Sequence, residues 1–296
     1  MYGALRLTNR DVHRVTADDF TGGESNMRVK GKVAFITGAG RGQGRSHAIH
    51  LAREGADLIL CDVAGAIPGN LIDPADPDDL QQTIAAVKQE RSDTRMIARH
   101  ADVRDPGALQ ELVNEGVAEL GKLDVVVANA GIFNYSLFLD HTPEMFTQVV
   151  DVNLSGVFNT CWATVPHMIK AGNGGSVILI SSTAGIKGQP FTPGYTAAKH
   201  GVVGLMKGLA NELGEYNIRV NTIHPAGVQT KMGEAPGLTD IIASKAETMG
   251  PLFMNSLPVE MMEPKDTSYA VVFLASDESR YVTGLQLKVD AGTSVR

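Results

Sequence analysis

Short apolar runs alternate with amphipathic stretches along most of the chain after residue 29. The apolar runs predict strands, and the stretches with apolar residues three and four positions apart predict helices. We expect strands at 32–37, 57–60, 96–100, 123–128, 177–180 and 285–289, and helices from Arg45, at 76–90, 106–120, 143–170 and 194–213. Strands that are apolar on both faces and alternate with helices form a parallel sheet covered on both sides. The pattern therefore predicts one doubly wound α/β domain over residues 29–296.

Two segments fall outside this alternation. Residues 1–28 are polar and irregular, without the apolar core of a secretion signal, and we expect them to form a disordered extension. Residues 63–79 form a longer connection than a strand and a helix usually need. Their apolar Ile67, Leu71 and Ile72 would need cover. This insertion is therefore either a surface loop or a flap over the adenosine end of a bound cofactor.

The glycine-rich segment after the first predicted strand is suited to hold a diphosphate. Gly38, Gly42 and Gly44 let the backbone turn sharply and let phosphate oxygens approach the first amides of a helix. A plain surface loop can have the same pattern, but the next strand ends at Asp62. An acidic side chain there accepts hydrogen bonds from the adenosine ribose hydroxyls and repels a 2′-phosphate. Arg41 could hold a 2′-phosphate instead, and we favour Asp62, hence NAD over NADP.

Three more groups of turn-forming or polar residues directly follow predicted strands. They are Asp102 with Val103, Asn129 to Gly131, and Ser181 with Ser182. Asp, Asn, Gly and Ser commonly end strands, so turn formation alone could explain each group. Ligands of parallel sheets, however, bind beyond the carboxyl ends of the strands. The position that the groups share favours a binding site.

Two predicted helices carry polar residues whose positions need an explanation. Asn153 lies inside the helix at 143–170, and because asparagine forms helices poorly, a buried Asn153 would need a bound water or a kink. In the helix at 194–213, Tyr195 and Lys199 are four residues apart and share one face. They are either an ordinary surface pair or a catalytic pair in which the Lys199 ammonium lies beside the Tyr195 phenol. Small glycine residues on the same helix suit close packing within or between subunits.

In combination these motifs resemble the short-chain dehydrogenase/reductase superfamily, in its common single-domain subclass. The resemblance covers 29–292 and rests on TGAGRGQG at 37–44, ANAG at 128–131, VNLSGVF at 152–158, ISSTAG at 180–185, YTAAK at 195–199 and HPAGVQT at 224–230. The runs GRGQGRSHA, HPAGVQTKM and LPVEMMEPKD and the insertion are similar to the carveol dehydrogenase group, the mycofactocin-coupled branch. For that branch the resemblance implies an insertion that traps NAD.

The resemblance implies a Rossmann fold with strand order 3-2-1-4-5-6-7, a homotetramer and bound NAD. It assigns to Tyr195 the acceptance of the hydroxyl proton of a secondary alcohol while hydride moves to the nicotinamide. Lys199 would lower the pKa of Tyr195 and hold the nicotinamide ribose. Ser182 would bind the reacting oxygen, and Asn153 would hold a water that links Lys199 to solvent. The NAD contacts implied are Gly38, Arg41, Gly42, Gln43, Gly44, Asp62, Asp102, Val103, Asn129, Ala130, Gly131, Tyr195, Lys199, Pro225, Gly227, Val228 and Thr230.

Substrate choice is expected to depend on residues 231–263, between the proline loop and the last helix. Five of the 11 methionines fall there, namely Met232, Met249, Met254, Met261 and Met262. A flexible, methionine-rich lid would suit a bulky apolar alcohol, cyclic or terpenoid and carveol-like. The methionines could equally pack a pair of helices. The absence of a basic cluster favours a neutral substrate.

Composition excludes several classes of partner. The formal net charge of −7 and the lack of a Lys/Arg cluster argue against nucleic-acid binding. No apolar run approaches the length of a membrane span. The two cysteines, Cys61 and Cys161, show no metal-ligand or redox spacing. We therefore expect a cytoplasmic protein without a metal that acts on a small molecule. The resemblance to the mycofactocin-coupled branch adds a mycofactocin-type redox carrier as the candidate electron acceptor.

Two other functions remain open at this point. One is an NAD-binding redox sensor without turnover, against which the intact set of Asn153, Ser182, Tyr195 and Lys199 argues. The other is a nucleotide-sugar epimerase. An epimerase would carry the spacing TGxxGxxG and a substantial C-terminal substrate domain, whereas this chain has TGxxxGxG and ends soon after its last predicted strand.

Overall fold

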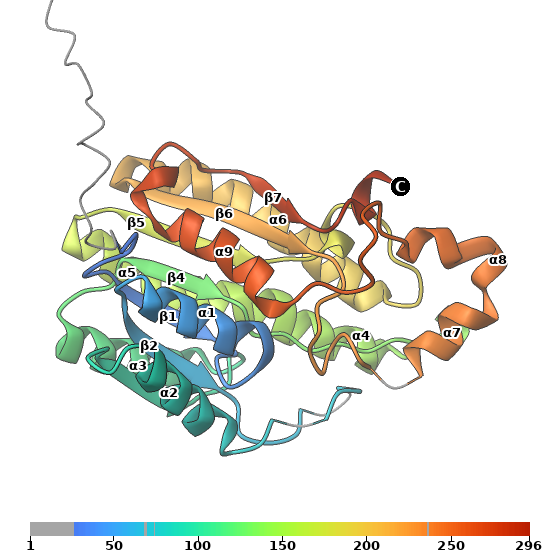
Figure 1. The fold of residues 1–296 in the computed structure, drawn as a ribbon, viewed down its shortest axis with the longest axis horizontal. Helices are drawn as coiled ribbons and strands as arrows, with labels where there is room; N and C mark the ends of the chain where they lie inside the picture. Colours follow the sequence, from blue (N-terminus) through green and yellow to red (C-terminus); the bar gives the residue numbers. More distant parts are fainter. Residues whose placement is uncertain (1–26, 68–69, 74, 236) are drawn as a thin grey trace, which may run out of the picture.

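The computed structural model describes residues 27–67, 70–73, 75–235 and 237–296. Within these ranges seven parallel strands form one sheet in the order β3-β2-β1-β4-β5-β6-β7, which confirms the predicted order (Figure 1). The strands are β1 (Val33–Thr37), β2 (Asp57–Asp62), β3 (Met96–His100), β4 (Val125–Ala128), β5 (Gly175–Ile180), β6 (Ile218–Pro225) and β7 (Gln286–Val289). The helices are α1 (Gly42–Arg53), α2 (Asp79–Glu90), α3 (Pro106–Leu120), α4 (Pro143–Val150), α5 (Gly156–Ala171), α6 (Pro193–Leu213), α7 (Leu238–Ser244), α8 (Ala246–Met249) and α9 (Pro264–Ala275).

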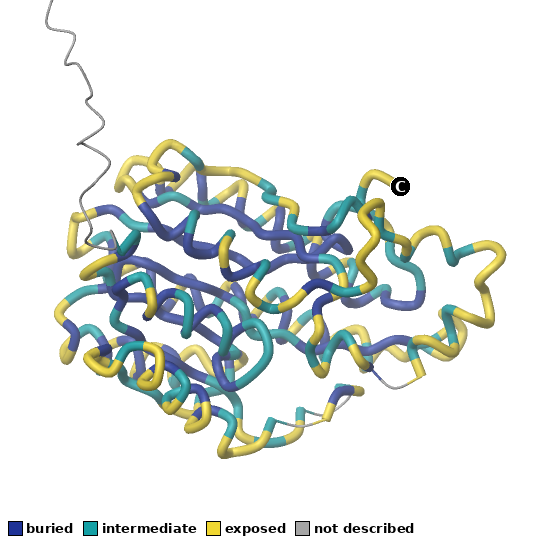
Figure 2. The backbone as a smooth tube through the Cα atoms, in the orientation of Figure 1, coloured by how far each residue is buried: buried dark blue, intermediate teal, exposed yellow. Residues whose placement is uncertain are grey.

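Each face of the sheet has its own apolar core, because successive strand residues point to opposite faces. Phe35 and Val126 belong to the core that α3, α5 and α6 cover. Their neighbours Ile36 and Val127 belong to the core beneath α1, α2 and α9. Figure 2 shows the strands as the most deeply buried part of the chain. Cover on both faces explains why the strand residues are apolar without alternation.

The predicted helix at 143–170 is interrupted by a π-helical turn, Asp151–Ser155, between α4 and α5. Asn153 lies in this turn and is fully buried. Its Nδ2 donates a hydrogen bond to the carbonyl of Ile132 at 2.9 Å, and its Oδ1 accepts one from the Ile132 N–H at 2.8 Å. The side chain therefore bonds the loop after β4, and the wider turn accommodates it.

Several boundaries differ from the predicted ones by one to three residues, and two of the differences have an explanation in specific contacts. Helix α2 begins at Asp79, because the residues before it form a turn in which the Asp76 carboxylate accepts the Asp78 N–H at 2.9 Å. Arg28, which we expected in the extension, is held by the domain: its N–H donates to Glu54 and its guanidinium pairs with Glu278. Residues 1–26 lie outside the described residues.

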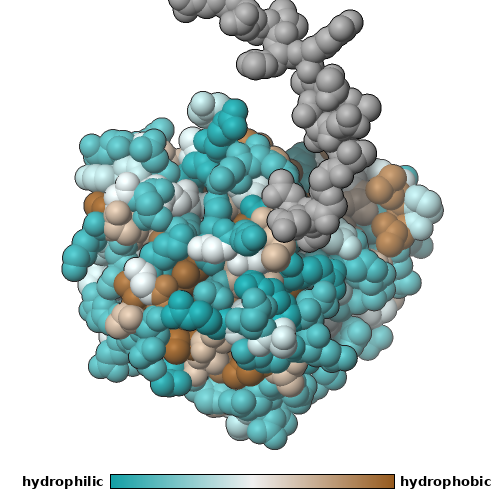
Figure 3. Space-filling model, turned by 60° about the vertical axis from the view of Figure 1, so that its left-hand side comes forward, coloured by the Kyte–Doolittle hydropathy of each residue, from teal (hydrophilic) through white to brown (hydrophobic). Residues whose placement is uncertain are grey.

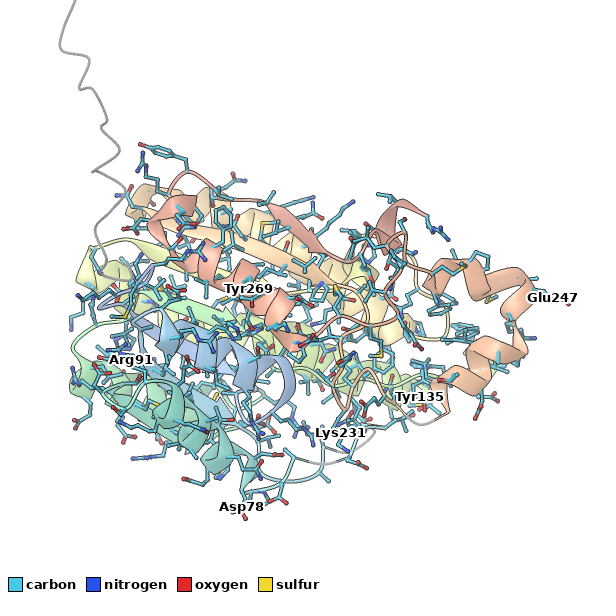
Figure 4. All side chains as sticks on the ribbon, in the orientation of Figure 1. Asp78, Arg91, Tyr135, Lys231, Glu247 and Tyr269 are labelled. Carbon is cyan, nitrogen blue, oxygen red and sulfur yellow. The ribbon has the colours of Figure 1, made fainter. Side chains whose placement is uncertain are left out.

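The helices α7 and α8 extend beyond one end of the sheet, and most of their surface is exposed (Figures 1 and 2). In Figure 4, Glu247 marks their outer tip, while Tyr135 and Lys231 lie between them and the sheet. The end of the molecule remote from them is largely hydrophilic in the view of Figure 3, with small apolar patches. None of the helices in the described ranges is both long and apolar enough to span a membrane.

Candidate active site

Two adjoining cavities lie beyond the carboxyl ends of the strands. The glycine-loop cavity, of about 420 Å³, is lined by residues 38–44, by the ends of β2 and β4 and by the insertion. The tyrosine cavity, of about 210 Å³, is lined by Ser182 and Tyr195 and by the segment after β6. Gln43, Thr230 and Met232 belong to the walls of both. A ligand can therefore extend from one cavity into the other.

The glycine loop is packed too closely for side chains at two of its positions. A Cβ on Gly44 would lie 1.9 Å from the carbonyl oxygen of Gly38, and Gly38 itself has a φ of +65°. Asn129 fastens the loop, because its Nδ2 donates to the carbonyl of Thr37 at 2.9 Å. The predicted cofactor residues that line this cavity are Gly38, Arg41, Gly42, Gln43, Gly44, Asp62, Asp102, Val103, Asn129, Ala130, Gly131 and Thr230.

Asp62 and Arg41 are arranged differently at the far end of the glycine-loop cavity. Asp62 Oδ2 accepts the N–H of Gly40 at 2.6 Å. Burial raises the pKa of Asp62, and hydrogen bonds from the backbone N–H groups of Gly40 and Val63 oppose that rise. Arg41 instead donates from Nη2 to the carbonyl of Asp73 at 2.5 Å. The arginine is thus engaged by the insertion, which favours Asp62 as the group that meets the ribose.

The insertion at 63–79 forms part of the wall of the glycine-loop cavity. Ile67 and Ile72 line it, whereas Leu71 is 43% exposed. Several contacts fasten the insertion to other segments. Among them, the Leu71 N–H donates to the carbonyl of Phe133 at 3.3 Å, and Asp73 pairs with Lys231 at 3.8 Å. Of the two alternatives, a loop that covers a ligand fits the structure better than a detached surface loop.

In the tyrosine cavity, the side chains of Ser182 and Tyr195 lie close enough to interact. Burial raises the pKa of Tyr195 to about 12, although the interaction with Ser182 acts in the opposite direction. The ring of Phe133 packs edge-on against that of Tyr195, with ring centres 5.0 Å apart. The predicted residues Pro225, Gly227 and Val228 line the same cavity.

Lys199 and Asn153 lie behind the cavities rather than in their walls. Lys199 Nζ donates to the carbonyl of Ile180 at 2.8 Å and lies 5.5 Å from the centre of the Tyr195 ring. Burial lowers the pKa of Lys199 to about 8. We expected Lys199 to lower the pKa of Tyr195. In the protein alone the pKa of Tyr195 is raised instead, because burial of the phenol has the larger effect.

Sequence reasoning missed several residues of the tyrosine cavity, among them Phe133 and Lys187. Phe133 follows the Asn129 to Gly131 turn, and its apolar character next to a strand end was the available signal. Lys187 gave no signal, because it is an isolated lysine in sequence. Its Nζ donates to the carbonyls of Leu252 and Thr293, both at 2.8 Å.

The lid methionines mostly pack against the protein. Of the five, Met232 lines the tyrosine cavity. Met262 is buried, and its N–H donates to the carbonyl of Gly227 at 2.9 Å. Met249 packs against the core, while Met254 is half exposed. The structure therefore favours packing over a methionine-lined substrate surface.

These cavities fit a dinucleotide. A cavity wall made of three glycines at the start of α1 suits a diphosphate, and the acid at the end of the second strand suits a ribose. The Oε1 atom of Gln43 is buried at the junction of the cavities and has no hydrogen-bond partner within the described ranges. A buried acceptor without a hydrogen bond destabilises the folded protein, and a bound ligand can supply the missing donor.

Comparison with known proteins gives consistent results. The family model described as enoyl-(acyl carrier protein) reductase matches residues 38–294. A short-chain type dehydrogenase/reductase of Mycolicibacterium smegmatis is 51% identical over 91% of this chain and 99% of its own. The (−)-trans-carveol dehydrogenase of Rhodococcus erythropolis is 44% identical over 91% of this chain and 99% of its own. A crystal structure of a short-chain dehydrogenase from Mycobacterium paratuberculosis bound to NAD is 46% identical, with a TM-score of 0.87 over 91% of this chain and 100% of that one.

Proposed function

The chain belongs to the short-chain dehydrogenase/reductase family, and from this premise we propose that it is an NAD-dependent oxidoreductase that interconverts a secondary alcohol and its ketone. One observation carries the proposal. Tyr195 and Ser182 lie close enough to interact in a cavity that adjoins the glycine loop at Gln43. An alcohol in that cavity would have a proton acceptor on one side and a dinucleotide site on the other.

The glycine loop and its neighbours would hold NAD. The first amides of α1 would bind the diphosphate, and Asp62 would accept hydrogen bonds from the adenosine ribose. Bound NAD would supply a hydride acceptor. Lys199 Nζ uses one of its three N–H donors on Ile180 within the described ranges, so donors remain for the nicotinamide ribose. Val228 and Thr230 would contact the nicotinamide end.

Tyr195 would exchange the proton with the reacting oxygen, while Ser182 would hold that oxygen by a hydrogen bond. Because burial raises the pKa of Tyr195 to about 12, the phenol carries its proton at neutral pH, as ketone reduction requires. Alcohol oxidation requires the phenolate, so its rate should rise with pH. The Lys199 ammonium, 5.5 Å from the ring centre, would stabilise that phenolate by its charge.

The tyrosine cavity suits a neutral, apolar alcohol. Its apolar walls are formed by Phe133, Val228, Met232, Leu238, Leu252 and Phe253. The ammonium of Lys187 is already bonded to two backbone carbonyls, so it is a poor partner for a substrate anion. The similarity to a carveol dehydrogenase supports a cyclic, terpenoid alcohol as the substrate class.

The insertion supports a second part of the proposal, which is that NAD stays bound between turnovers. It lines the glycine-loop cavity and is fastened to Phe133 and Lys231. A retained cofactor has to be reoxidised in place, so a redox carrier such as mycofactocin would accept the electrons. Exposed apolar side chains on α4 and α5, namely Phe146, Phe158 and Trp162, support self-association, which we propose to be tetrameric.

The test starts with protein purified without added cofactor. It is denatured, and NAD(H) and NADP(H) are measured per protomer; native protein is then assayed on a cyclic terpenoid alcohol with NAD, with and without an artificial electron acceptor. Near-stoichiometric NAD and turnover that needs the acceptor are expected. Turnover with free NAD alone would overturn the retention of cofactor. NAD binding without turnover of any alcohol tested would overturn the enzyme proposal and favour a redox sensor.

A further inference from the structure

A buried histidine lies directly behind Ser182. His224, near the end of β6, is fully buried, and its Nδ1 is 2.7 Å from the carbonyl oxygen of Ser182. Its Nε2 is 2.8 Å from the hydroxyl oxygen of Thr222. The imidazole is thus held at both nitrogens. It lines neither cavity, so it does not reach a ligand itself.

One neutral tautomer satisfies both contacts of His224. A carbonyl oxygen only accepts, so Nδ1 carries the hydrogen and donates it to Ser182. Nε2 then accepts the hydroxyl hydrogen of Thr222, which is shared with the more distant carbonyl of Leu285 at 3.3 Å. Burial lowers the pKa of His224. The Lys199 and Lys288 ammonium groups also lower it, while the Ser182 carbonyl and Asp290 oppose them. The imidazole therefore remains neutral around pH 7.

The histidine acts where the pairing of β5 with β6 ends. The paired residues run up to Ile180 with Ile223, and the Ser181 N–H donates to the carbonyl of Ile223 at 2.8 Å. At Ser182 the chain turns away from β6, and the hydrogen bond from the His224 imidazole to the Ser182 carbonyl connects it to that strand. The same carbonyl accepts the N–H of Gly185 at 2.9 Å, which closes the turn.

We propose that His224 is a positioning residue that fixes the Ser182 backbone and so keeps the Ser182 hydroxyl in contact with Tyr195. The inference rests on the proposed function, because it concerns the same proton transfer. The interaction with Ser182 acts to lower the pKa of Tyr195. Loss of the His224 bond therefore weakens both the hold on the reacting oxygen and the acidity of the phenol.

Three variants test the inference. His224→Leu removes both hydrogen bonds and keeps an apolar side chain in the buried position. His224→Asn retains an N–H donor near the position of Nδ1. His47→Leu is the matched control, because His47 is also fully buried, bonds through Nδ1 to the Ser268 hydroxyl at 2.8 Å, and lies outside both cavities.

The readouts are kcat and KM for the alcohol with an artificial electron acceptor, the NAD content per protomer, the pH profile of oxidation, and the thermal midpoint. For His224→Leu we expect kcat to fall about tenfold or more, the NAD content to stay unchanged, and the profile to move to higher pH. His224→Asn should recover much of kcat and the profile. His47→Leu should change the thermal midpoint alone. Wild-type kcat and pH profile in a folded His224→Leu would overturn the inference.

A failure of the proposed function can be distinguished from a failure of this inference. If the wild type oxidises no alcohol, the inference is decided by amide hydrogen exchange in the 182–187 turn. Exchange at Ala184 and Gly185, whose N–H groups bond Ser182, should be faster in His224→Leu but not in His224→Asn. Equal exchange in all three proteins would overturn the positioning role.

Discussion

The glycine-loop cavity and the lid over the tyrosine cavity are built in different ways. The cavity is formed by strand ends that bond each other, as Asn129 bonds Thr37 and as Asp62 bonds Gly40. The helical part of the lid consists of α7, α8 and a short 3₁₀ turn, Gly250–Phe253, and none of these three contains a buried residue. Figure 2 shows the contrast as dark strands against a largely exposed lid.

Few hydrogen bonds fasten the lid to the rest of the protein. Lys187 bonds the carbonyl of Leu252. Thr293 and Asn255 bond each other from the C-terminal segment. A change in the glycine loop must therefore disturb the sheet, whereas a change in the lid can leave it intact. This difference suits a constant cofactor and a substrate that varies among relatives.

The largest expected effect separates chemistry from cofactor binding. Tyr195→Phe removes the phenolic hydroxyl and keeps the ring that packs against Phe133. We expect turnover to fall by roughly 10²- to 10⁴-fold with the NAD content of the purified protein unchanged. Loss of NAD together with activity would mean that the hydroxyl of Tyr195 acts mainly by binding the cofactor.

A pair of glycine variants compares the two regions directly. A Cβ at Gly44 would overlap the carbonyl of Gly38, so Gly44→Ala should lower the free energy of unfolding by about 1–3 kcal/mol and abolish NAD retention. Gly237 in the lid has a φ of +79° but no atom closer than 3.4 Å to an added Cβ. Gly237→Ala should cost only about 1 kcal/mol and retain NAD. Urea unfolding and NAD content measure both, and equal losses in the two variants would contradict the contrast.

Cofactor choice should depend on Asp62. Asp62→Asn removes the charge that would repel a 2′-phosphate and keeps an acceptor for the Gly40 N–H. We expect the preference for NAD over NADP to fall by about tenfold, or about 1.4 kcal/mol. Binding of both dinucleotides is measured by calorimetry after removal of retained cofactor. An unchanged ratio would point to Arg41 and Asp79 as the groups that decide it.

Stability should fall at acidic pH through α1, behind the glycine loop. Burial lowers the pKa of His47 to about 3, against about 6.5 in an unfolded chain. The unfolded chain therefore binds a proton below pH 6.5 that the folded protein does not. Each pH unit below that value should cost up to about 1.4 kcal/mol of unfolding free energy. Urea unfolding at pH 7 and 5.5 measures this, and His47→Leu should show a smaller pH dependence than the wild type.

The smallest effect is expected at the contact between the insertion and the lid. Lys231 and Asp73 form an exposed ion pair, with side chains 60% and 75% accessible. Lys231→Ala should speed NAD release by less than about fivefold, because exposed pairs contribute at most about 1 kcal/mol. Ile72→Ala should act more strongly, since Ile72 is buried in the cavity wall. Rates of NAD release, measured by stopped-flow displacement, compare the two variants, and a larger effect of Lys231→Ala than of Ile72→Ala would contradict this order.

Local patterns were sufficient for most of the fold. Helix α3 begins and ends as predicted because its signals are adjacent in sequence: Asp105 caps its first turn, and Gly121 takes the left-handed conformation that ends it. Strand β6 had no such signal, since its polar Asn221, Thr222 and His224 interrupt the apolar run. Those side chains find their partners on Val282, Leu285 and Ser182, which are distant in sequence.

The candidate site divides along the same line. The sequence by itself determined the strand order, through the family resemblance, and the residues with a local signature, such as Tyr195 one helical turn from Lys199. Only the tertiary structure decided what Asn153 bonds, how Lys187 fastens the lid to the C-terminal segment, and that His224 lies behind Ser182. Periodicity and capping are short-range effects that a sequence displays. A hydrogen bond between distant segments depends on where the packed sheet places its donor and acceptor.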